Sequence, residues 1–109
     1  MKKQAAYHWT ATYLSQIGNW PLMVEREYFG YFLSVENIKK GIGFDIEALL
    51  KTKDADFNLL SKDDQEKVKK LIERIQGVRS TGELKDVCKE CSRLSNEFDN
   101  LILSRTLQD

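Results

Sequence analysis

The sequence predicts an all-helical fold: a compact single-domain bundle of about five helices that occupies residues 1–109. Apolar residues recur at helical spacing along most of the chain, and two Ser-x-x-acid segments have the pattern of helix N-caps. Pro21 is the only proline, and a chain of 109 residues has the usual size of one domain. The alternative is an α+β fold, in which an N-terminal β-hairpin over residues 5–34 packs on two C-terminal helices.

Two helices are expected before Gly41 and Gly43, roughly over residues 3–17 and 20–40. Apolar residues of the first recur at helical spacing: Ala6, Trp9, Tyr13 and Ile17. Gly18 and Asn19, with Pro21 just beyond, are typical of a helix end. The second has an equally regular apolar series: Val24, Tyr28, Tyr31, Val35 and Ile38. Tyr7, Trp9, Ala11 and Tyr13 also recur at every second position, as in a strand, and this pattern keeps the hairpin alternative open.

The middle of the chain is expected to interrupt the helical pattern. Residues 40–43, Lys-Gly-Ile-Gly, combine two glycines and predict a break. A short helix follows in this interpretation, capped by Asp45 and extending through Leu50. The charged linker 53–60 comes next, and its apolar residues are expected to attach it to the core.

Two longer helices are predicted in the C-terminal half. Ser61 and Asp64 form a capping pair for the first, which Gly77 ends. Its apolar face consists of Val68, Leu71, Ile72 and Ile75. Ser80 caps the second, expected over residues 82–105. That helix carries a heptad seam: Leu84, Val87, Cys91, Leu94, Phe98 and Leu101.

Composition excludes several classes of function. Seventeen basic and seventeen acidic residues give a formal net charge of zero, so the chain as a whole does not attract nucleic acid or anionic lipid. The sequence contains no apolar run long enough to span a membrane and no secretory signal pattern, so we expect a cytoplasmic protein without membrane contact. Phosphate-binding and dinucleotide-binding motifs are absent from the sequence, and we expect no catalytic residue and no enzyme.

Cys88 and Cys91 form the one motif associated with metal or redox chemistry. A zinc site needs four ligands, and beyond this pair the sequence offers a single histidine, His8. Redox cysteine pairs lie at a helix N-terminus, whereas this pair begins several residues into a predicted helix. The two thiols are therefore expected to pack in the core, with no metal and no cofactor.

Residues 35–50 resemble, in part, the helix-hairpin-helix motif of non-specific DNA-binding proteins. The resemblance centres on Gly41-Ile42-Gly43 between two predicted helices. It implies a turn whose backbone amides bind a phosphate, with charge added by the neighbouring lysines. The nucleic-acid-binding residues under this alternative are Lys39, Lys40, Gly41 and Gly43.

Aromatic residues are concentrated near the N-terminus: eight of eleven lie in the first 32 residues. Large aromatic side chains and arginine are enriched at the centres of protein interfaces. We therefore expect a protein that acts by binding another protein, as an adaptor, an inhibitor or immunity protein, or an assembly subunit, with a homodimer as one form. The residues expected to bind the partner are Trp9, Trp20, Arg26, Phe29, Phe98 and Leu101.

Overall fold

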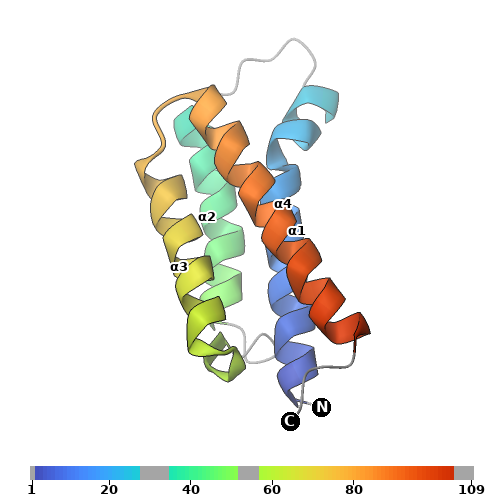
Figure 1. Cartoon of the computed structure of the whole chain (residues 1–109). Coiled ribbons are helices and arrows are strands. Elements are labelled where there is room, and N and C mark those ends of the chain that lie inside the picture. Colours follow the sequence, from blue (N-terminus) through green and yellow to red (C-terminus); the bar gives the residue numbers. More distant parts are fainter. Residues whose placement is uncertain (1, 28–34, 52–56, 105–109) are drawn as a thin grey trace.

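The computed structural model describes residues 2–27, 35–51 and 57–104, without the side chains of 22–27 and 35–37. Over these ranges the predicted all-helical fold is confirmed, with four α-helices rather than about five. The helices are α1 (Lys2–Glu27), α2 (Val35–Lys51), α3 (Lys62–Gly77) and α4 (Thr81–Leu103), and a 3-10 turn, η1 (Phe57–Leu59), precedes α3. They form an elongated bundle in which α1 and α4 pack together, while α2 and α3 lie next to each other (Figure 1).

The first helix does not end where the sequence predicted. α1 continues through Gly18, Asn19 and Pro21 as far as Glu27, so the expected boundary after residue 17 is wrong. Gly18 lies where α1 meets α4: a Cβ atom there would be 2.9 Å from the carbonyl oxygen of Cys88 and closer still to Ser92 Oγ. This glycine permits a close helix approach. The hairpin alternative is also wrong for residues 5–27, which are helical, whereas 28–34 lie outside the described residues.

The predicted break at 40–43 is wrong as well. α2 extends from Val35 to Lys51 without interruption, in place of a helix that ends at 40 and another that begins near Asp45. Gly41 faces the ring of Trp20, where a Cβ atom would lie 2.5 Å from the ring carbon Cη2. The glycine thus allows α1 and α2 to approach. The apolar face of α2 continues past it in a buried series: Ile38, Ile42, Ile46 and Leu49.

Both C-terminal helices begin at the predicted caps. The backbone N–H of Asp64 donates to Ser61 Oγ at 3.2 Å, and that of Glu83 donates to Ser80 Oγ at the same distance. These hydrogen bonds satisfy amides that a helix start leaves without a partner. The predicted apolar face of α3 is buried, and so is the seam of α4 from Leu84 through Phe98.

One cluster of buried side chains joins the four helices. Near one end of it the ring of Tyr7 meets the ring of Phe98 edge to face, with centroids 5.0 Å apart. The Tyr7 hydroxyl donates to Asp64 Oδ2 and accepts from the backbone N–H of Ser61, so α1 is tied to the start of α3. Ser95 Oγ of α4 donates to the carbonyl oxygen of Ala11 in α1 at 2.7 Å. The hydrogen bonds of Tyr7 and Ser95 therefore fix α1 relative to α3 and α4. The buried Thr10 hydroxyl, by contrast, has no hydrogen-bond partner among the described residues.

Within the described residues, none of the helices combines the length and apolar character that a membrane span requires.

Candidate functional site

The two tryptophans expected to bind a partner lie in different surroundings. Trp9 is 39 % exposed on α1, between the rings of His8 and Tyr13. Trp20 packs against the core instead, and its indole N–H donates to Asp45 Oδ2 on α2 at 2.7 Å. Its ring covers Gly41. Trp20 therefore joins α1 to α2, and Trp9 keeps the accessibility that a partner would need.

The α4 residues of the expected partner surface belong to the core. Phe98 is 1 % exposed, so its assignment to a binding surface is wrong: the heptad seam turns it toward Tyr7. Leu101 is partly buried and packs against the same cluster. The side chain of Arg26 and the whole of Phe29 lie outside the described residues.

The helix-hairpin-helix resemblance does not correspond to a turn. Gly41 and Gly43 lie inside α2, where backbone amides are already used by the helix. Lys39 Nζ donates to the carbonyl oxygens of Gln76 at 2.7 Å and Val78 at 3.0 Å, at the C-terminal end of α3. Lys39 thus satisfies carbonyls that a helix end leaves open, which is a structural role. The phosphate-binding turn is absent from this segment.

The cysteine pair is buried in the α4 seam, and both thiols are free. Burial raises the pKa of Cys88 to about 11 and that of Cys91 to about 12. Both therefore remain protonated at neutral pH, whereas a nucleophile or a metal ligand must be a thiolate. No group of three or more metal-ligating side chains is present in the part of the chain that the structure describes.

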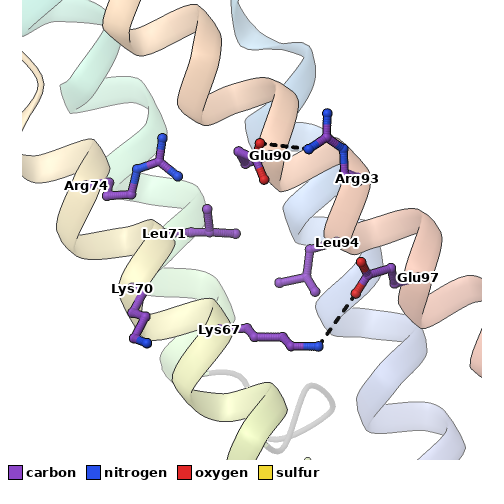
Figure 2. A pocket seen from close by; sticks show the side chains of 8 residues that line it. All are labelled: Lys67, Lys70, Leu71, Arg74, Glu90, Arg93, Leu94 and Glu97. Atoms are coloured by element: carbon purple, nitrogen blue, oxygen red, sulfur yellow. Dashed lines mark hydrogen bonds and ion pairs between the residues drawn. The ribbon is translucent and has the colours of Figure 1, made fainter.

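A groove between α3 and α4 carries most of its charge in pairs (Figure 2). Lys67 reaches across it to Glu97 at 3.8 Å, and Arg93 binds Glu90 along α4 at 2.9 Å. Buried leucines form its floor, and its volume is about 290 Å³. The residues that line it are Lys67, Lys70, Leu71, Arg74, Glu90, Arg93, Leu94 and Glu97. The other two charged side chains that line the groove, Lys70 and Arg74, are both on α3.

A second hollow, of about 340 Å³, lies between α2 and α3 and is lined mainly by apolar groups. Leu50 stands at its edge and is 49 % exposed. Phe44, on the same helix, is 74 % exposed and is the only aromatic side chain more than half exposed among the described residues. We call the exposed side of α2 the α2 face; it consists of Lys40, Phe44, Glu47, Leu50 and Lys51.

The α2 face was not predicted from the sequence, because a break was expected at residues 40–43. Once α2 is continuous, Lys40, Phe44, Glu47 and Lys51 recur at intervals of four, three and four, which puts them on one side of the helix. Phe44 then occupies a helical surface position instead of a turn. This spacing could have identified the face if residues 40–43 had been treated as helical.

Comparisons with protein-family models, with curated proteins and with solved structures find no match for this chain. The α2 face, with the hollow beside it, is the strongest candidate site on the described surface.

Proposed function

We propose that this protein acts by protein–protein interaction through the α2 face and performs no catalysis of its own. The observation that supports the proposal is the exposure of Phe44, at 74 %. An apolar hollow adjoins the other edge of the same face, at Glu47, Leu50 and Lys51. Burying a large apolar side chain contributes roughly 1.5–3 kcal/mol. A partner that covers Phe44 would gain most of this free energy, and one that also covers Leu50, which is 49 % exposed, would gain a smaller part in addition.

The chemistry of the face fits a protein partner better than a small molecule or a nucleic acid. Protein interfaces typically have an apolar centre, rich in aromatic residues, and a polar rim. Phe44 supplies such a centre, and the charged side chains of Lys40, Glu47 and Lys51 lie along the same side of α2. Leu50 adds an apolar group at the edge of this face, beside the hollow. Adaptor, inhibitor or immunity, and assembly-subunit roles all use this mode of binding. We place the protein in the cytoplasm, where two free thiols stay reduced.

Affinity capture from the native host tests the proposal. We expect Phe44→Asp and Leu50→Asp each to abolish recovery of the bound protein, because a carboxylate cannot enter an apolar contact without losing its hydration. The matched control is Leu103→Asp, since Leu103 is 78 % exposed but lies on α4. Circular dichroism should show that all three variants keep the helical fold. Retention of the bound protein by both α2 variants, or its loss with Leu103→Asp alone, would contradict the proposal.

A further inference from the structure

We infer that the partner covering the α2 face is a second copy of this chain, paired so that the two α2 helices run antiparallel. The inference rests on the proposed function, because it names the partner of that same face. In this pair Phe44 packs against Phe44 of the partner subunit. Lys40 of each copy then lies beside Glu47 of the partner subunit.

The spacing of the charges along α2 fits an antiparallel pair. Lys40 comes four residues before Phe44 and Glu47 three residues after it, which places them about 6 Å and 4.5 Å from Phe44 along the helix axis. In an antiparallel partner whose Phe44 lies at the same height, the partner's Lys40 lies on the Glu47 side and the partner's Glu47 on the Lys40 side. Lys40 of one copy and Glu47 of the partner subunit then differ by about 1.5 Å along the helix axis, well within the reach of a lysine side chain.

The side chains also share one direction around the helix. At about 100° per residue, Lys40, Phe44, Glu47 and Lys51 fall within a strip roughly 60° wide. One facing helix can therefore contact all of them. A parallel pair in register would place Lys40 against Lys40 and Glu47 against Glu47, which opposes like charges. The order of charges on this face thus selects the antiparallel arrangement.

The charged groups are available for these contacts. Lys40 is exposed and makes no hydrogen bond or ion pair with the residues that the structure describes. Glu47 binds Lys51 through Oε1 at 2.6 Å, on the exposed surface of the same helix. A carboxylate has two oxygens and can accept several hydrogen bonds, so Glu47 can also accept from Lys40 of the partner subunit. A net charge of zero also means that two copies do not repel each other as whole molecules.

Two aromatic rings at the centre supply the apolar part of the contact. Phe44 is 74 % exposed in a single copy, and pairing hides both rings at once. Aromatic pairs are favourable beyond the area they bury. The contact is small for a protein interface, so we expect a dimer that dissociates readily upon dilution.

Sedimentation of the purified full-length chain tests the inference, over a concentration series that reaches about 1 mM because a small interface binds weakly. We expect wild type to dimerise and Phe44→Asp to remain monomeric. Lys40→Glu and Glu47→Lys should each weaken the dimer by about tenfold or more, because each change replaces two attractions with two repulsions. Lys40→Glu combined with Glu47→Lys in one chain should restore it to within about threefold, since both contacts are then attractive again.

Lys70→Glu is the matched control, because it changes the net charge by the same amount on α3, away from the α2 face. It should leave the dimer unchanged, and circular dichroism should show that every variant remains helical. A wild type that stays monomeric throughout the series overturns the inference, as does a charge exchange that fails to restore the dimer. If wild type is monomeric but Phe44→Asp still abolishes capture from the host, a different protein occupies the face and the proposed function stands. If both results are negative, both proposals are wrong.

Discussion

Phe98→Ala is expected to lower the free energy of unfolding by about 3–5 kcal/mol, the cost of deleting a fully buried phenylalanine. Phe98 is 1 % exposed and meets the edge of Tyr7, so its removal leaves a cavity between α4 and α1. Tyr7 in turn holds Asp64 and the Ser61 amide at the start of α3. The loss of the Phe98 ring therefore weakens the packing of α4 on α1 and, through Tyr7, the contact of α1 with α3. Urea denaturation followed by circular dichroism measures the effect.

Leu103→Ala is the control for this prediction, because Leu103 lies on the same helix but is 78 % exposed. A surface substitution of this kind changes stability by no more than about 0.5 kcal/mol. Equal effects of the two substitutions would show that Phe98 is not a core residue, and the packing of α4 on α1 described above would be wrong.

Gly18→Ala is expected to destabilise the protein by about 1–3 kcal/mol, although alanine favours helices more than glycine does. The added Cβ would meet Ser92 Oγ and would lie 2.9 Å from the backbone carbonyl oxygen of Cys88. A side chain can rotate away, whereas a carbonyl within a helix cannot, so α1 and α4 must separate. Thermal unfolding of the variant measures the cost.

Gly43→Ala serves as the matched control and should have the opposite sign. Nothing lies within 4 Å of a Cβ atom built at Gly43, so the substitution keeps only the gain in helix propensity. That gain amounts to at most about 1 kcal/mol. If Gly18→Ala stabilises the protein as much as Gly43→Ala does, the close approach of α1 and α4 at Gly18 is not real.

Features of the fold that depend on neighbouring residues could be predicted from the sequence. The caps at Ser61 and Ser80 are local, because each serine contacts an amide three residues ahead. The apolar faces of α3 and α4 follow from helical periodicity alone. These two helices were therefore expected close to their observed bounds.

The glycines could not be interpreted correctly from local sequence. Gly18 and Gly41 have the same chemistry whether they end a helix or allow another helix to approach. What decides between the two roles is a residue far away in the chain: Cys88 and Ser92 for Gly18, and Trp20 for Gly41. The local sequence predicts a helix end at both glycines, and this prediction is wrong because α1 and α2 each continue through them.

The candidate site differs from the predicted one because most of the predicted residues pack in the core and because α2 is one helix. The aromatic residues near the N-terminus suggested a binding surface, but Trp20 is used to pack α1 on α2. Phe98 follows the heptad seam into the core, as its spacing alone indicated. Phe44 was not among the predicted binding residues, because it lies directly after the break expected at residues 40–43. The exposed face of a helix is visible only when the helix has its correct bounds.

Amide hydrogen exchange across residues 39–47, measured by NMR on the purified chain, tests most directly the claim that α2 is one helix. The α2 face exists only if the helix continues through Gly41 and Gly43. We predict helical chemical shifts and exchange protection for both glycine amides, because each donates to a carbonyl of the preceding turn. Unprotected amides with turn-like shifts at Gly41 and Gly43 would contradict the account, since Lys40, Phe44 and Glu47 would then share no common face.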